Sequence, residues 1–239
     1  MGRKTISFKR ILLKISGEVL AGKKSFGIDP NLTQKIANRI KEIHSKSIQI
    51  GVVIGGGNIF RGISVSAKGM DRVAADYLGM MATIMNSVAL QSELEKIDCD
   101  TRVMSALSVT QLAEPYIRRR ATRHLEKNRI VIFAGGTGNP YFTTDTAAVL
   151  RGVEINADVI IKGTKVDGIY SSDPIKDQNA VKYDELSFKE VIEQELKIMD
   201  MTAFTLCKEN NIPIIVLNIN DENSLSDLIN YKDIGTIVS

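Results

Sequence analysis

Short, mainly apolar runs alternate with longer amphipathic segments along this chain, and this alternation constrains the fold more than any other feature. The clearest apolar runs cover residues 10–16, 48–54, 129–134, 158–163 and 212–219. Short runs that are apolar throughout are typical of strands buried on both faces. Strands that alternate with helices form parallel sheets covered by helices on both sides. We therefore predict a three-layer α/β/α fold with a mostly parallel central sheet.

The segments between these strands carry helix-start signals. Asp29 precedes Pro30, which is the order of an N-cap residue and a first helical residue. Ser187 and Glu190 have the spacing of a capping box, and Asp200 is placed to cap a helix. Further helices are expected over about residues 70–96, 144–155 and 200–210. A basic helix is expected to end near residue 128. No linker rich in Pro, Gly or Ser divides the chain, so we expect residues 1–239 to form a single domain.

Composition excludes several classes of protein. A formal net charge of +3 is too small to indicate a nucleic-acid partner. Cys99 and Cys207 are far apart and are predicted to be free thiols in a reducing compartment. The basic N-terminus lacks an apolar signal segment, and the uncharged stretch 77–92 looks too short and too polar to span a bilayer. We expect a cytoplasmic protein that binds neither membrane nor nucleic acid.

Four of the predicted strands end in loops of unusual composition. These loops are KISGE (14–18), GGGNIFRG (55–62), GGTGNPYFTT (135–144) and KGTKVDGIYSSDP (162–174). In a parallel sheet they share one edge, where ligands collect. Glycines let backbone N–H groups approach an anion, and a helix N-terminus adds a favourable field. Any one loop is equally explained by a tight turn, but four on one edge predict a nucleotide site.

The common nucleotide-binding motifs are absent from the sequence. There is no GxxxxGK[ST], and neither glycine loop fits GxGxxG with an acidic residue about twenty positions on. The HRD and DFG motifs of protein kinases are also missing. The phosphate-binding scaffold must therefore be of another kind.

In their order and spacing, the four loops closely resemble those of the bacterial uridylate (UMP) kinases, which have the amino-acid-kinase fold. The resemblance runs from about residue 9 to the end and is thinnest between about 88 and 128. It implies transfer of the γ-phosphoryl group of ATP to UMP, giving ADP and UDP, in pyrimidine nucleotide biosynthesis. Mg²⁺ would enter bound to ATP, since the sequence shows no carboxylate cluster to cage it.

The resemblance also implies roles for individual residues. Lys14 and Arg61 would neutralise phosphate charge, Asp145 would orient the lysines, and Lys162 would add positive charge. The implied ATP-binding residues are Lys14, Ile15, Ser16, Gly17, Gly57, Arg61, Thr164, Tyr170 and Asp173. The implied UMP-binding residues are Gly56, Asp76, Thr137, Gly138, Asn139, Pro140, Tyr141, Phe142, Thr143 and Thr144, with Asp76 facing the ribose hydroxyls.

Each assignment has a purely structural alternative. Lys14 is otherwise a strand-end lysine that reaches solvent, and Arg61 a solvated surface arginine. Asp145 is otherwise a first-turn acid favoured by the helix dipole. Tyr141 and Phe142 are equally well explained by core packing.

Two further features concern partners. The segment around Met80, Met81 and Met85 is rich in apolar residues, which indicates either a core helix or self-association. The resemblance favours self-association, because members of the family form hexamers built from dimers. The basic run at 117–124 is predicted to be a solvated helix face. Its alternative is an anionic effector site that includes Arg102 and Arg129, since the family responds to GTP as activator and UTP as inhibitor.

Three other functions compete with UMP phosphorylation. The first is another kinase of the same fold that phosphorylates a carboxylate or carbamate, and the GTGNPYFTTD loop argues against it. The second is a regulatory module that binds UMP or UTP without turnover. Lys14, Arg61 and Asp145 together favour an enzyme, because a sensor has no need of a charge-neutralising set. The third is a dinucleotide-dependent oxidoreductase, which the missing fingerprint disfavours.

Overall fold

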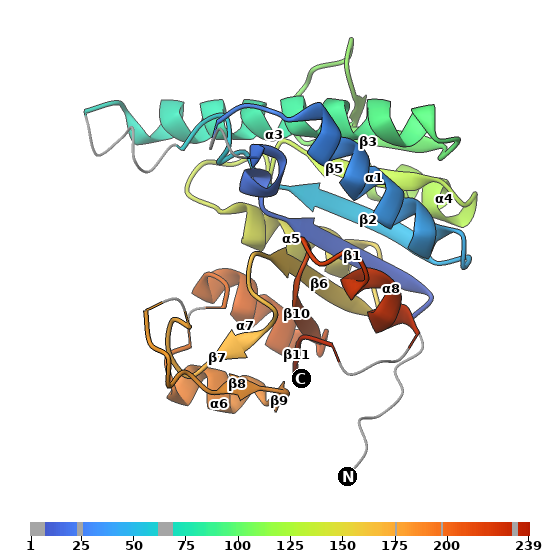
Figure 1. Ribbon diagram of the computed structural model, residues 1–239. Coiled ribbons are helices and arrows are strands. Elements are labelled where there is room, and N and C mark those ends of the chain that lie inside the picture. The colour runs from blue at the N-terminus through green and yellow to red at the C-terminus, as the bar shows by residue number, and fades with distance from the viewer. Residues whose placement is uncertain (1–7, 23–25, 62–68, 175, 197, 231–233) are drawn as a thin grey trace.

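A nine-stranded sheet runs through the computed structural model, which describes residues 8–22, 26–61, 69–174, 176–196, 198–230 and 234–239 (Figure 1). The strand order is β4-β3-β5-β2-β1-β6-β10-β11-β9. The strands are β1 (Arg10–Ile15), β2 (Gln49–Ile54), β3 (Thr101–Ser105), β4 (Glu114–Pro115), β5 (Ile130–Ala134), β6 (Val159–Thr164), β9 (Glu185–Leu186), β10 (Ile214–Asn218) and β11 (Thr236–Val238). Every neighbouring pair is parallel except β10 with β11. The predicted, mostly parallel sheet is confirmed.

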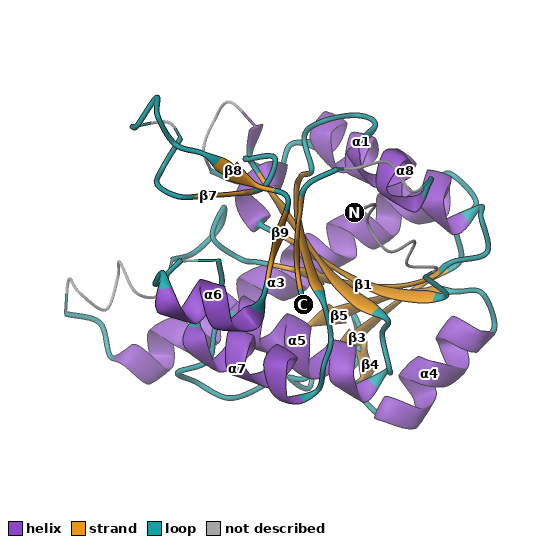
Figure 2. Ribbon diagram, turned by 90° about the horizontal axis from the view of Figure 1, so that it is seen from below, coloured by secondary structure: helices purple, strands orange, loops and turns teal. Residues whose placement is uncertain are grey.

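Helices cover both faces of the sheet (Figure 2). One face carries α1 (Pro30–His44), α3 (Arg72–Lys96) and α8 (Ser224–Ile229). The other carries α4 (Arg118–Glu126), α5 (Thr144–Glu154), α6 (Phe188–Glu193) and α7 (Met201–Glu209). Along β1, Leu13 packs into the first core and Leu12 into the second, as the alternation of side chains in a strand requires.

The predicted caps form. The Asp29 carboxylate accepts the N–H groups of Asn31 and Leu32, and Ser187 with Glu190 closes the capping box of α6. The long helix begins at Arg72 rather than near residue 70, because the Asp71 carboxylate accepts the N–H of Ala74 and so caps it there. Cys99 and Cys207 are both buried free thiols, as predicted.

The helix α3 has two different faces. Met80 and Ile84 are buried, whereas Tyr77, Met81 and Met85 are exposed. By length and composition α3 could cross a membrane, contrary to the expectation for residues 77–92, although 44% of its apolar window is buried inside the molecule. A buried core helix meets the same criteria, and α3 packs against α1 and β3.

A short antiparallel hairpin stands apart from the main sheet. It pairs β7 (Ile169–Tyr170) with β8 (Lys182–Tyr183), and it follows the carboxyl end of β6. A 3₁₀ turn, η1 (Gly17–Leu20), follows β1 at the same edge. The loops after β1, β2, β5 and β6 therefore meet at one edge, where the site is built.

Candidate active site

Lys14 and Lys162 lie opposite each other on neighbouring strands, because β1 and β6 are paired in that register. Both ammonium groups contact one carboxylate from the first turn of α5. Asp145 Oδ1 is 2.6 Å from Lys14 Nζ, and Asp145 Oδ2 is 2.8 Å from Lys162 Nζ. None of the three side chains is more than 15% exposed. Lys14 is therefore not a lysine that reaches solvent, and three predicted catalytic residues form one buried cluster.

The pKa values of this cluster follow from its charges. Burial alone would raise the pKa of Asp145, but the ammonium groups of Lys14 and Lys162 outweigh burial and hold that pKa below its ordinary value. Burial lowers the pKa of Lys162; Asp145 opposes this shift, and Lys14 adds to it. With both lysines protonated, the two cations exceed the one carboxylate, so the cluster suits an anionic ligand.

Asp200 reaches the rim of the cluster from α7. Its carboxylate caps that helix by accepting the N–H of Ala203 at 3.0 Å, as the sequence predicted. It also accepts hydrogen bonds from the hydroxyls of Thr143 and Thr146, the latter with an Oγ1–Oδ1 distance of 3.0 Å. This second role joins α7 to the start of α5. The partners are more than 50 residues apart in the chain, so no sequence spacing could reveal it.

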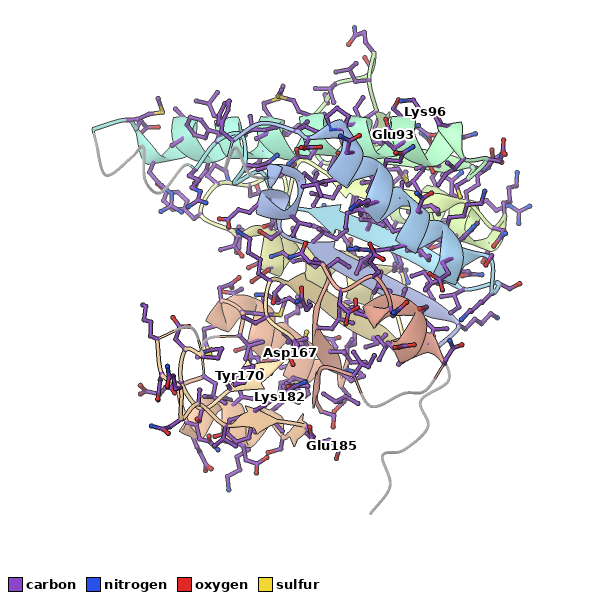
Figure 3. All side chains as sticks on the ribbon, viewed as in Figure 1. Glu93, Lys96, Asp167, Tyr170, Lys182 and Glu185 are labelled. Atoms are coloured by element: carbon purple, nitrogen blue, oxygen red, sulfur yellow. The ribbon has the colours of Figure 1, made fainter. Side chains whose placement is uncertain are left out.

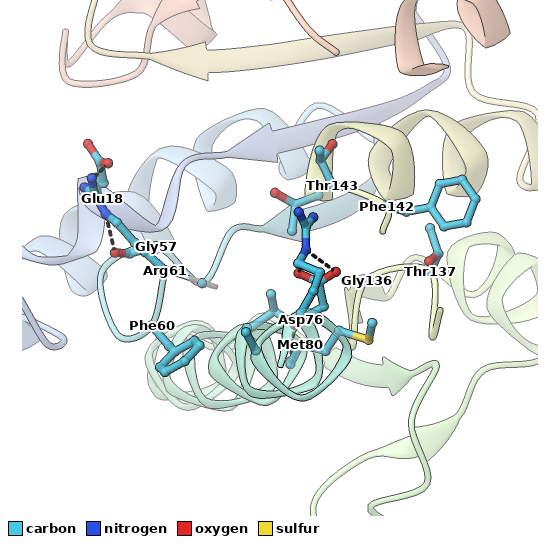
Figure 4. Close-up of a pocket in the computed structure, with 16 residues that line it drawn as sticks. Glu18, Gly57, Phe60, Arg61, Asp76, Met80, Gly136, Thr137, Phe142 and Thr143 are labelled. Atoms are coloured by element: carbon cyan, nitrogen blue, oxygen red, sulfur yellow. Dashed lines mark hydrogen bonds and ion pairs between the residues drawn. The ribbon is translucent and has the colours of Figure 1, made fainter. Parts of the chain in front are cut away.

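A cavity of about 500 Å³ opens between α3 and the loops after β2 and β5 (Figure 4). The wall contains eight of the residues predicted to bind nucleotide: Gly56, Gly57, Arg61, Asp76, Thr137, Phe142, Thr143 and Thr144. Thr144 precedes Asp145 in the chain, which places this first cavity beside the buried cluster. Glu18 and Arg72 also line it and were not predicted.

The loop after β5 bends around this cavity. Gly138, Asn139 and Pro140 complete the loop but are not among the wall residues. The Thr137 hydroxyl accepts the N–H of Asn139 at 3.1 Å, which closes a turn. Tyr141 is 67% and Phe142 50% exposed, so core packing is the wrong explanation for both rings.

Asp76 is tied to two partners within the first cavity. Its carboxylate accepts the Nε–H of Arg72 at 2.8 Å and the backbone N–H of Tyr141 at 2.8 Å. The Arg72 guanidinium also lies 5.6 Å from the centroid of the Tyr141 ring. Asp76 is thus more than a polar-face carboxylate, because it connects α3 to the loop after β5.

Glu18 joins cations from two different loops. Its Oε1 pairs with the guanidinium of Arg61, and its Oε2 lies 3.2 Å from Lys165 Nζ. Arg61 also donates its Nε–H to the carbonyl of Gly57 at 3.1 Å. Arg61 is therefore a paired side chain, although more than half of it is exposed.

Ile15, Ser16 and Gly17 lead from β1 into η1 at the same edge. The Ile15 carbonyl accepts the N–H of Gly55 at 2.9 Å. A side chain at position 17 would overlap the carbonyl of Gly55 and the side chain of Asn58. Gly17 is therefore required for the first two loops to pack together.

A second cavity, of about 530 Å³, lies beyond β6 and is lined by Lys162, Thr164, Tyr170 and Asp173. Ile198 and Val216 add apolar surface. The Tyr170 hydroxyl donates to Asp167 at 2.6 Å (Figure 3). Lys162 belongs both to this wall and to the buried cluster, so the cluster lies where the two cavities approach each other.

This arrangement can hold two phosphorylated ligands end to end, with cations between them. The glycine loops offer backbone N–H groups, and Arg61 offers a guanidinium fork. Across the described parts of the chain, no group of three or more His, Cys, Asp or Glu side chains could hold a metal ion. The chemistry that fits best is charge neutralisation during phosphoryl transfer.

Comparison with known proteins agrees with this geometry. Residues 9–218 match the model of the amino acid kinase family. The structure is similar to the UMP kinase from Bacillus anthracis, with a TM-score of 0.95, 37% identity and coverage of 98% of this chain and 97% of that one. The UMP kinase from Ureaplasma parvum gives a TM-score of 0.91, 40% identity and coverage of 97% and 98%. The uridylate kinase from Archaeoglobus fulgidus gives a TM-score of 0.73, 28% identity and coverage of 96% of this chain and 99% of that one.

Proposed function

Because the chain belongs to the amino acid kinase family, we propose that it phosphorylates UMP with ATP and so produces UDP and ADP. An oxygen of the UMP phosphate attacks the γ-phosphorus of ATP. A new P–O bond forms as the bond to the β–γ bridging oxygen breaks, and ADP leaves with that bonding pair. The observation that carries the proposal is the Lys14–Asp145–Lys162 cluster between two cavities of nucleotide size.

We assign the first cavity to UMP. Gly56 brings its backbone to the phosphate, and Arg61 exchanges Glu18 for phosphate oxygens. Asp76 faces the ribose hydroxyls. The loop from Thr137 to Thr144, including Gly138, Asn139 and Pro140, encloses the base beside Tyr141 or Phe142.

We assign the second cavity to the adenosine half of ATP, held by Thr164, Tyr170 and Asp173. The ATP phosphates then extend over the loops that contain Ile15, Ser16, Gly17 and Gly57. Lys14 and Lys162 neutralise the charge of the transferred phosphoryl group, while Asp145 holds the two ammonium groups apart and in place.

Mg²⁺ enters as Mg–ATP in this proposal. The described side chains include no acidic cage, so phosphate oxygens and waters supply its ligands. When bound, the ion would neutralise part of the phosphate charge, while Lys14, Lys162 and Arg61 supply the protein's own cations.

The wider context is proposed on the same basis. The enzyme would act as a single domain in cytoplasmic pyrimidine nucleotide synthesis, upstream of UTP and CTP. Support for self-association, to a homohexamer, comes from the exposed Tyr77, Met81 and Met85 of α3. GTP as activator and UTP as inhibitor would require an anion site, for which the exposed arginines of α4 are the available cations.

The test is ADP release from Mg–ATP with UMP, CMP, dUMP, aspartate, glutamate or carbamate as separate acceptors. Turnover confined mainly to UMP is expected. Turnover with carbamate or an amino acid would instead indicate another kinase of this fold. Binding of UMP or UTP without any turnover would indicate a sensor and refute the proposal.

A further inference from the structure

One face of α3 carries polar side chains that hold the backbone of two loops. Asp76, Thr83 and Asn86 are spaced by seven and three residues, which places them on the same side of a helix. Asp76 accepts the N–H of Tyr141 at 2.8 Å, and Thr83 Oγ1 accepts the N–H of Gly135 at 2.9 Å. Asn86 donates to the carbonyl of Gly55 at 2.7 Å. The helix therefore contacts the loops after both β2 and β5.

Close backbone packing strengthens this arrangement. A side chain at position 56 would come within 2.7 Å of the Gly79 carbonyl and 2.8 Å of the Ala82 side chain. Asn86 and Asn58 are buried and exchange amide hydrogen bonds of 2.7 and 3.0 Å. The loop after β2 thus lies directly on α3.

Thr83 is the contact that fixes the second loop. Its hydroxyl donates to the Met80 carbonyl at 2.7 Å, so its oxygen presents a lone pair to the N–H of Gly135. Gly135 is buried, and a buried N–H without a partner is costly. Gly136 and Thr137, the next two residues, form part of the wall of the first cavity. A shift of Gly135 would therefore move the wall itself.

We infer that Thr83 is a positioning residue for the acceptor nucleotide: through Gly135 it fixes the distance across the first cavity. Thr83 itself lines the first cavity, but its side chain is only 3% exposed and both hydrogen bonds of its hydroxyl go to backbone groups, so it acts through the loop. Thr83 is not among the residues that line the second cavity. Binding of the acceptor, rather than of ATP, is the property that Thr83 controls. This inference rests on the proposed function.

Ser87 provides a matched control one turn along α3. It is equally buried, and its hydroxyl bonds only to the Thr83 carbonyl within the helix, at 2.7 Å. Thr83→Val and Ser87→Ala each remove one buried hydroxyl and nearly preserve side-chain shape. Only the first change breaks a contact to a loop. Thr83→Ser keeps the hydroxyl and should restore function.

The experiment measures kcat and the KM for UMP and for ATP in the wild type and these three variants. Thr83→Val should raise the KM for UMP about tenfold, the effect of one lost buried hydrogen bond, and change the KM for ATP less than about twofold. Thr83→Ser and Ser87→Ala should both stay within about threefold of wild type. An unchanged KM for UMP in Thr83→Val, or equal increases for both substrates, would overturn the inference.

A measurement on the wild type covers the case in which Thr83→Val does not fold. The Gly135 amide should exchange its hydrogen much more slowly than the amides of Gly136 and Thr137. Exchange at Gly135 as rapid as at those two residues would contradict the inference. Absence of wild-type turnover would refute only the proposed function. The affinity of the variants for UMP and the exchange of Gly135 would then still decide the role of Thr83.

Discussion

The two cavities differ in how their walls are held. Around the first, two buried hydrogen bonds join α3 to distant loops, those of Thr83 with Gly135 and of Asn86 with Gly55. Around the second, the hydrogen bonds of Tyr170 with Asp167 and of Ser172 with Asp177 are exposed and local, while one buried bond, from the Ile169 N–H to Thr236 Oγ1 at 2.8 Å, ties the hairpin to β11. Buried hydrogen bonds cost more to break than solvated ones. The α3 side of the first cavity is thus more rigid than the exposed hairpin side of the second.

The largest effect is expected at the centre that both cavities share. Lys14→Ala should lower kcat about 1000-fold, because it removes a preorganised cation from the transferred group. The KM values for UMP and ATP should change only a few-fold each. Steady-state kinetics with either substrate varied would measure this, with Lys35→Ala on the exposed face of α1 as control. Near-normal turnover in Lys14→Ala would contradict the role assigned to Lys14 in the cluster where the two cavities approach each other.

A neighbouring pair of glycines tests the rigidity of the first cavity. Gly56→Ala should lower the free energy of unfolding by about 1–3 kcal/mol, since the new methyl group would collide with the backbone of α3. Gly57→Ala should be nearly neutral, because the atoms nearest to its new methyl group are those of the Arg61 side chain, 3.9 Å away. Denaturant titration of both variants is the measurement. Equal stabilities of the two variants would mean that the loop after β2 can move away from α3. The first cavity would then be no more rigid than the second.

The sequence predicted the parts of the site that local patterns encode. The loops at one sheet edge followed from strand ends and a helix start, which are short-range signals, whereas the roles of Lys14 and Asp145 came from the resemblance to the UMP kinases. The pairing of Glu18 with Lys165 and of Thr83 with Gly135 was not predicted. Each depends on residues 50 or more positions apart, brought together only by the order of strands in the sheet.

The same limit explains what the sequence left open about single side chains. Tyr141 and Phe142 were equally compatible with core packing, because an aromatic residue in a loop carries no periodicity to show which side faces solvent. The second role of Asp200 was missed since an N-cap already accounts for an Asp before a helix. Composition and spacing thus identify candidate residues, and packing decides their partners.

A pH profile of turnover would test the role of Lys162, which lies where the two cavities approach each other. Burial lowers the pKa of Lys162, so its ammonium group should lose its proton below the ordinary lysine value of about 10.4. As the pH rises, turnover should therefore decline at a lower pH than the titration of an ordinary lysine would allow. Lys162→Met has no proton to lose at this position, so its residual turnover should lack this alkaline decline. Identical alkaline profiles for the two proteins would contradict the assignment of Lys162.

The smallest effect is expected in the second cavity, from a hydroxyl deletion that parallels Thr83→Val. Tyr170→Phe removes the hydrogen bond to Asp167, which keeps its ion pair of 3.0 Å with Lys182. Asp167 is 56% exposed, so water can replace the lost partner, and exposed contacts contribute about 0–1 kcal/mol. The KM for ATP should therefore rise by less than about threefold, with the KM for UMP unchanged.

That hydroxyl is also a reliable hydrogen-bond donor at neutral pH. The hydrogen bond to Asp167 is the main cause that raises the pKa of Tyr170, so the phenol stays protonated. If Tyr170→Phe raised the KM for ATP tenfold or more, the hydroxyl would have to contact the nucleotide itself rather than only Asp167. The second cavity would then depend on individual polar contacts as strictly as the first does, and the difference between the two would lie in exposure alone.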